Sequence, residues 1–260
     1  MPTVLQVVLA LLLAHLLADF PLQSSAMVLA KKTGWLAYAK HGLIHYLCAQ
    51  GCLLLFTDEP LYSLRVQGLL VVYVLVHVAT DIGKQVLVGS KVFPDRAWLF
   101  LADQAAHVAT IIAIAWGMTR VPWVTLRALV RWSDTEKLHL LVAGVVYVAA
   151  LFGGGYFIRY CTRSLSAELL AARGETREEL RNAGLYIGWL ERFLIITALL
   201  LQSPALVGLV LTGKSIARFP QFHDARFAEY FLIGTLLSIG IALLGGMVLV
   251  RYFYGSLSLR

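Results

Sequence analysis

Four hydrophobic stretches of this chain each carry two ionisable residues spaced four apart. Residues i and i+4 lie one turn apart on the same face of a helix, so both members of a pair can point to one place. Imidazole nitrogens and carboxylate oxygens are common protein ligands of zinc, non-haem iron and manganese. The pattern therefore indicates a divalent metal site, with hydrogen-bonded His/Asp pairs that only fix helix packing as the alternative. The four pairs are His15 and Asp19, His41 and His45, His77 and Asp81, and Asp103 and His107.

The four pairs also agree in depth. The first and third stretches hold their pairs near the end, and the second and fourth hold theirs near the start. If consecutive helices cross in alternating directions, all eight residues fall in one half of the bilayer. Four residues of helix separate two levels by about 6 Å. The deeper level contains His15, His45, His77 and His107, and the other contains Asp19, His41, Asp81 and Asp103.

Ionisable side chains inside a membrane need compensation. A charge at the centre of a span costs about 2.5 to 3.5 kcal/mol on insertion scales. A divalent metal compensates carboxylates directly, and helix bundles build such sites from ligands on facing helices. Eight candidates exceed one tetrahedral ion, so they serve two ions, or one ion with supporting partners. Zinc is the favoured metal, with iron and manganese as alternatives.

The residues beside the cluster suggest roles in binding and catalysis. Gln23, Gln104 and Lys84 are candidates for substrate binding, with Lys84 attracting a phosphate or carboxylate. The alternative is interfacial snorkelling of the lysine and ordinary polarity at helix ends for the glutamines. An aspartate that does not bind metal could act as a general base. The catalytic candidates are therefore Asp19, Asp81 and Asp103.

The composition places these stretches in a membrane. Hydrophobic residues make up 59% of the 260 residues and charged residues 14%, against roughly 25% charged in soluble domains. The net charge of +7 fits cytoplasmic loops that face anionic lipid. Basic residues and aromatics do not alternate along a stripe, so membrane lipid is the expected partner and nucleic acid is not.

Seven apolar runs predict an all-α, polytopic transmembrane bundle, because each approaches the roughly 20 residues that a helix needs to cross. The first four form a core at 1–118. An interfacial periplasmic segment at 119–137 follows, then C-terminal membrane helices at 138–260 with a charged cytosolic segment at 159–183. The first run is expected to be a retained helix. The predicted spans are Thr3–Gln23, Trp35–Thr57, Leu64–Val88, Arg96–Met118, Leu138–Ile158, Tyr186–Thr212 and Phe227–Val250.

Lysine and arginine set the expected orientation. They gather around the first and third turns, which places these turns in the cytosol and the N-terminus outside. Lys214 and Arg218 do not fit seven simple crossings, and Pro204 could break the sixth span into a re-entrant pair. The charged set around Glu191 and Arg192 is expected to anchor helix ends at the interface, with a lipid-headgroup or partner site as the alternative.

Glycines in the last span predict a close helix contact, either within the chain or between copies in a homo-oligomer. They are Gly234, Gly240, Gly245 and Gly246.

Several motifs occur together in this chain. They include HLLADFPLQ from His15, HVATDIGK from His77, DQAAH from Asp103, YIGWLERFLI from Tyr186 and GKSIARF from Gly213. With HGLIH from His41 and AEYFLIGTLLS from Ala228, the set resembles the bacterial inner-membrane proteins of domain-of-unknown-function family 3307. The resemblance implies a multi-pass inner-membrane protein whose polar motifs belong together. It does not imply a reaction.

Three functions remain open at this point. The leading hypothesis is a metal-dependent membrane hydrolase that acts on a lipid or lipid-linked substrate at the cytosolic leaflet. The second is an ion- or proton-coupled transporter, since intramembrane Asp and His chains serve pumps. The third is a non-catalytic membrane scaffold, for which His45 and His107 would be dispensable.

Overall fold

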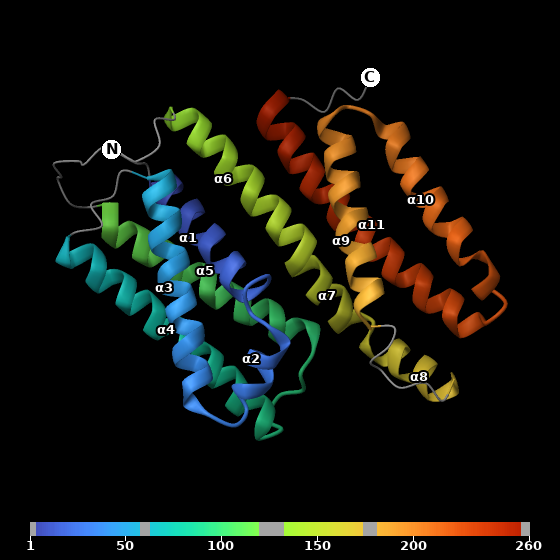
Figure 1. Cartoon of the computed structure of the whole chain (residues 1–260), viewed down its shortest axis with the longest axis horizontal. Coiled ribbons are helices and arrows are strands. Elements are labelled where there is room, and N and C mark those ends of the chain that lie inside the picture. Colours follow the sequence, from blue (N-terminus) through green and yellow to red (C-terminus); the bar gives the residue numbers. More distant parts are fainter. Residues whose placement is uncertain (1–3, 58–62, 120–132, 174–180, 256–260) are drawn as a thin grey trace. The chain divides into compact units, whose positions relative to one another are not determined.

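The computed structural model describes residues 4–57, 63–119, 133–173 and 181–255 (Figure 1). Within these ranges the chain forms helices and no strand, which confirms the all-α class. Most of the predicted interfacial segment at 119–137 lies outside them, as do residues 174–180 of the predicted charged segment. The chain divides into two compact units, Met1–Val145 and Val146–Arg260.

Four long helices form the first unit. They are α1 (Val4–Asp19), α3 (Trp35–Phe56), α4 (Leu64–Gly89) and α5 (Ala97–Thr119). α1 packs on α3 and α5, and α4 packs on the same two helices, so the four close into a ring (Figure 1). The first four predicted helices are therefore present, with ends that shift by a few residues.

α1 supplies much of the core of this bundle. Val7, Ala10, Leu11 and Ala14 are fully buried, and its buried residues lie on more than one side. A helix that is apolar all round fits a position enclosed by neighbours. α6 (Asp134–Val148) approaches α1 closely at Gly144, where an added Cβ would lie 3.4 Å from the Leu13 side chain.

A short helix that the sequence pattern did not predict follows α1. This helix, α2, covers Ser25–Ala30. The Ser24 hydroxyl caps it by accepting a hydrogen bond from the Met27 amide at 3.2 Å. The chain leaves α2 at Lys31, whose side chain turns back toward the bundle to contact Asp81.

The fifth predicted span is one continuous helical stretch. α6 runs into a π-helical turn, η1 (Ala149–Gly153), and then into α7 (Gly154–Cys161). α8 (Arg163–Arg173) follows within the predicted charged segment. The last predicted span is also present, as α11 (Ala225–Tyr254).

The sixth predicted span is not a single helix, and the break proposed at Pro204 as the alternative is confirmed. The structure has α9 (Arg181–Leu200), then α10 (Pro204–Arg218) and a 3₁₀ turn, η2 (Phe219–Gln221). Pro204 has no amide hydrogen to continue α9, and Gln202 takes a positive φ of 53° in the turn before it. α10 packs on α9, which makes the two a helical hairpin.

Charged residues lie inside the second unit, where the sequence predicted interface anchors. Glu191 and Arg192 are 4% and 3% exposed. Arg192 donates to the Ser238 hydroxyl on α11 at 3.1 Å and to the Leu151 carbonyl in η1 at 2.7 Å. Glu191 pairs with Lys214 on α10 at 2.6 Å. The anchoring hypothesis is therefore wrong for these residues, which join the helices of this unit.

Four helical stretches in the described ranges are long and apolar enough to cross a membrane. They are Leu64–Gly89, Ala97–Thr119, Asp134–Cys161 and Ala225–Tyr254. α1 is apolar but shorter, at 16 residues.

Two of the four glycines in α11 make the predicted close contact within the chain. A Cβ at Gly246 would overlap the Leu199 side chain on α9, and one at Gly245 would lie 3.2 Å from Val146. Among the described residues, a Cβ at Gly234 or Gly240 would have no neighbour within 4 Å. The second half of α11 therefore packs inside the second unit.

Replacing Gly246 by alanine is expected to lower the stability of the second unit by about 1 to 3 kcal/mol, because the added methyl group displaces Leu199. Gly240→Ala is the matched control. It should be neutral, or stabilising by up to about 1 kcal/mol, because alanine favours a helix more than glycine does. Thermal unfolding in detergent, followed by circular dichroism, compares the two. Equal effects would refute the packing of Gly246 on α9.

Candidate metal centre

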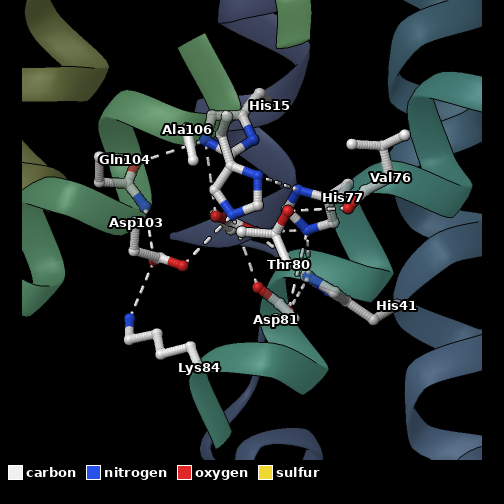
Figure 2. Close-up of polar contacts among 12 residues, drawn as sticks. His15, His41, Val76, His77, Thr80, Asp81, Lys84, Asp103, Gln104 and Ala106 are labelled. Carbon is white, nitrogen blue, oxygen red and sulfur yellow. Dashed lines mark hydrogen bonds and ion pairs between the residues drawn. The ribbon is translucent and has the colours of Figure 1, made fainter. Parts of the chain in front are cut away.

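The antiparallel bundle brings the four His/Asp pairs to one place. The end of α1 and the second half of α4 meet the first turns of α3 and α5, and side chains from these helices converge in Figure 2. The five histidines and Asp103 are buried. The side chains of Asp19 and Asp81 are 11% and 16% exposed. All eight residues singled out in the sequence therefore belong to one cluster.

The histidines of the deeper level lie against one another. The ring centroids of His45 and His77 are 3.7 Å apart, and those of His77 and His107 are 4.2 Å apart. His15 completes the group, with its ring 4.9 Å from that of His107. The four histidines that the sequence placed at one depth therefore lie close together in the structure.

Asp19 is the centre of the first group of ligand atoms. Its Oδ1 lies 3.0 Å from His45 Nε2, 3.2 Å from His41 Nε2 and 3.4 Å from His77 Nε2. Its Oδ2 lies 3.6 Å from His15 Nε2. Ligands at 2.0 to 2.1 Å from a tetrahedral zinc ion are about 3.3 to 3.4 Å apart. The spacing around Asp19 matches that of a coordination shell, and it is also that of hydrogen bonds between the carboxylate and the imidazoles.

A second group of ligand atoms lies between α4 and α5. His107 Nε2 is 3.6 Å from Asp81 Oδ1 and 3.6 Å from Asp103 Oδ1. Both His107 Nε2 and Asp103 Oδ1 are buried without a hydrogen-bond partner. A buried polar atom without a partner is rare and destabilising. Together with the Asp81 carboxylate, these two atoms are spaced so that one cation could bind all three residues.

His77 and Asp81 connect the two groups. His77 Nε2 lies 3.1 Å from His41 Nε2, and its Nδ1 lies 3.1 Å from His107 Nδ1. Asp81 directs one carboxylate oxygen at His41, at 3.5 Å, and the other at His107. The cluster is therefore one continuous network, which can coordinate two cations or pass a proton along its imidazoles.

Two lysines neutralise two of the three carboxylates. Lys31 Nζ lies 2.6 Å from Asp81 Oδ2, and Lys84 Nζ lies 2.9 Å from Asp103 Oδ2 (Figure 2 shows the second pair). Among the described residues, the ion-pair partners of Asp19 are four imidazoles. With all five imidazoles neutral, three carboxylates and two ammonium groups leave one negative charge, centred on Asp19, which a bound cation or a proton on an imidazole would balance.

The three polar residues predicted beside the cluster all contact it. Gln104 Oε1 lies 3.4 Å from His15 Nε2, and its amide nitrogen donates to Asp103 at 3.4 Å (Figure 2). In the amide orientation that satisfies both of its atoms, Gln23 accepts from Lys31 Nζ at 2.6 Å and donates to the Asp19 carbonyl at 3.2 Å. Lys84 is the third. Their role in substrate binding stays a prediction.

Two residues of the site were missed in the sequence. Lys31 had been assigned only to a basic loop, and nothing in its spacing links it to Asp81. Tyr73 is 1% exposed, and its hydroxyl lies 3.1 Å from His45 Nδ1, so it can fix the ring whose Nε2 faces Asp19. A signal for Tyr73 exists, because it stands one turn before His77 on the same helix face.

The fold and site define an all-helical protein with four helices that can cross a membrane and a buried His/Asp cluster in its N-terminal bundle. The profile of the family described as protein of unknown function (DUF3307) matches residues 7–150. The match covers more than half of the chain and every residue of the cluster, so this chain belongs to that family. No curated protein and no solved structure matches it.

Lys31→Met is expected to lower the stability of the chelator-treated protein by roughly 1 to 3 kcal/mol, because it leaves the Asp81 carboxylate without its ammonium partner. Lys32→Met, at the exposed neighbouring position, is the control and should change stability little. Thermal unfolding of both variants gives the comparison. The ion pair would be unimportant if the two variants unfolded alike.

Proposed function

We propose that this chain is a membrane-embedded, metal-dependent enzyme, a hydrolase that acts on a lipid or lipid-linked substrate at the cytosolic leaflet. The observation that supports it most is the Asp19 carboxylate, which lies among four imidazole nitrogens at 3.0 to 3.6 Å with no lysine beside it in the described part of the chain. A divalent cation compensates this charge and uses the imidazoles as ligands.

The distances support a division of the ligands between two ions. Asp19 with its imidazoles would hold the first ion, from the set His15, His41, His45 and His77. Asp81, Asp103 and His107 would hold the second. Asp81 directs an oxygen at each group and would bridge them. Zinc is the favoured metal because the ligands are imidazoles and carboxylates, and iron and manganese accept the same donors.

The chemistry follows from this ligand set. A bound divalent ion acidifies water and polarises a carbonyl or phosphoryl oxygen. The aspartate among Asp19, Asp81 and Asp103 that is least engaged with metal would accept the proton of the attacking water. Lys84, whose side chain is 24% exposed, would hold an anionic group of the substrate, with Gln23 and Gln104 beside it. The water oxygen would bond to the carbonyl carbon or the phosphorus of the substrate, and the bond from that atom to the leaving oxygen would break. The leaving oxygen would depart with the proton that the aspartate had accepted.

The topology we propose keeps the N-terminus outside and the first and third turns in the cytosol of a bacterial inner membrane. α1, α3, α4, α5 and the α6–α7 stretch then cross in alternation, and α9 crosses outward. Because α10 runs back along α9, Lys214 and Arg218 return to the cytosolic half. The helical hairpin thus removes the conflict that seven simple crossings had left.

Elemental analysis of the purified chain tests the metal proposal. We expect one or two divalent ions per chain, with zinc the most abundant. The metal content should fall in acidic buffer, because protonated imidazole cannot bind metal. A content below about 0.2 ions per chain, in protein purified without chelators and then offered zinc, would contradict the proposal.

Paired variants separate the two ion sites. His45→Ala should remove metal from the Asp19 group, and His107→Ala should remove it from the other, each reducing the content by about one ion. His139→Ala, in an ordinary histidine outside the cluster, is the control. If the double variant of His45 and His107 kept full function in cells, the scaffold alternative would replace the enzyme.

Cysteine labelling tests the topology. In a background with Cys48, Cys52 and Cys161 replaced by serine, cysteines at Lys32 and Lys91 should resist a membrane-impermeant maleimide in intact cells. A cysteine at Ser133 should react, because the topology places the start of α6 outside. The reverse pattern would invert the orientation and move the cluster to the outer leaflet.

Transport is the second candidate, and one observation favours it. Tyr46 and Gln50 on α3 both donate to Gln67 on α4, the second at 2.6 Å, so polar contacts continue beyond the cluster in the first unit. A conducting path would make cysteines at positions 50 and 67 accessible to small cationic reagents from outside. An enzyme with a site open to one leaflet would leave them unreactive.

A further inference from the structure

An apolar groove runs along the outside of the first unit between α3 and α4. It has a volume of about 420 Å³. Trp35, Tyr38 and Tyr46 line it from α3, and Val71, Val78 and Ile82 are among its residues on α4. Its lining side chains include exposed apolar ones on helices that we assign to the membrane, such as Leu43 at 57% and Leu75 at 62% exposure.

The groove is as long as one leaflet is thick. From Trp35 to Tyr46 the helix rises about 16 Å, at 1.5 Å per residue. The hydrocarbon core of a bilayer is about 30 Å thick, so the groove matches one half of it. On α3 this segment contains His41 and His45 on its buried face, so the groove and the cluster occupy the same half of the membrane.

Gly42 sets how closely the groove approaches the cluster. It follows His41 and lines the groove, and a Cβ there would lie 3.0 Å from Val74 Cγ1 and 3.3 Å from Val78 Cγ2. α3 and α4 therefore meet at this glycine, which forms a floor for the groove one residue from a proposed ligand.

A positive charge lies at one end of the groove. Lys31 Nζ lies 5.6 Å from the ring centroid of Tyr38, a lining residue, and 2.6 Å from Asp81 in the cluster. An ammonium group has three donors. Asp81 accepts one and Gln23 a second, so one donor is left, and the side chain, although only 9% exposed, lies beside the Tyr38 ring that lines the groove. Lys31 thus connects the mouth of the groove to the site.

We propose that the groove between α3 and α4 binds one acyl chain of an anionic phospholipid, with the phosphate at Lys31. The lipid enters sideways from the leaflet, and its headgroup linkage then lies beside Asp81. Binding of the lipid is independent of the metal, whereas its role as the substrate rests on the proposed function.

Photo-crosslinking tests this assignment. The full chain is reconstituted in nanodiscs of phosphatidylglycerol with a trace of the same lipid carrying a diazirine in one tail, and labelled residues are mapped by mass spectrometry. We expect labels at Leu43, Val71 and Leu75, and few on the exposed face of α5 at Leu101 and Ile112. Equal labelling of both faces would overturn the proposal.

Two variants sharpen the test. Ala39 is exposed and lines the groove, so the larger side chain of Ala39→Phe fills it. This variant should reduce groove labelling about tenfold, which corresponds to about 1.4 kcal/mol of binding free energy. Ala109→Phe, at an exposed position of α5, is the matched control and should leave groove labelling unchanged. If Ala39→Phe labelled like Ala109→Phe, the acyl chain would not occupy the groove.

Headgroup selectivity tests Lys31. A probe based on phosphatidylcholine should label the groove less than the phosphatidylglycerol probe, and Lys31→Gln should remove this difference while Lys31→Arg keeps it. Equal labelling by both probes in the unmodified chain would overturn the role of Lys31. Metal content is measured on the same samples. Groove labelling in protein that binds no metal refutes the proposed enzyme and supports the lipid site, whereas metal without selective labelling refutes the lipid site alone.

Discussion

The Asp19 carboxylate constrains the rest of the N-terminal bundle. It is held inside an apolar ring of helices, and four imidazole nitrogens surround it. An isolated charge in such a place is strongly unfavourable, so its surroundings must supply positive charge or ligands. α3 and α4 supply three of the four imidazoles, which requires these helices to keep a fixed rotation toward α1. The cluster therefore fixes the bundle as much as the bundle positions the cluster.

The two units use buried charge differently. In the first unit, the three carboxylates of the cluster outnumber the two lysines that pair with them, and the imidazole nitrogens point toward the carboxylates and toward one another. In the second, Arg192 bonds to a hydroxyl and to a carbonyl of the π-helical turn, and Lys214 pairs with Glu191. These cations are bonded across helices and therefore serve the packing of η1, α9, α10 and α11. This contrast, and the family match that ends at residue 150, supports assigning the chemistry to the N-terminal part.

Sequence periodicity predicted the features that depend on local geometry. The i, i+4 spacing of His77 and Asp81 was enough to place both on one face, and the apolar runs gave α3 and α5 to within a few residues. Contacts that form where the chain folds back on itself were missed. Lys31 reaches Asp81 only because α2 turns the chain back. The division into α9 and α10 was predicted only as an alternative, because the apolar character continues across Pro204. Arg192 looked like an anchor because hydropathy does not show what a side chain meets inside a bundle.

The position of α2 separates two tasks that are often combined in one helix. The spanning helices carry the ligands and must keep their packing, whereas Lys31 comes from a connection of modest length between α1 and α3. Changes at residues 24–30 would alter the shape beside Lys31 while leaving its pair with Asp81 in place. If the proposed lipid site holds, varying residues 24–30 would change the preference for a headgroup, and an engineer could exchange this segment while the Lys31–Asp81 pair stays the same.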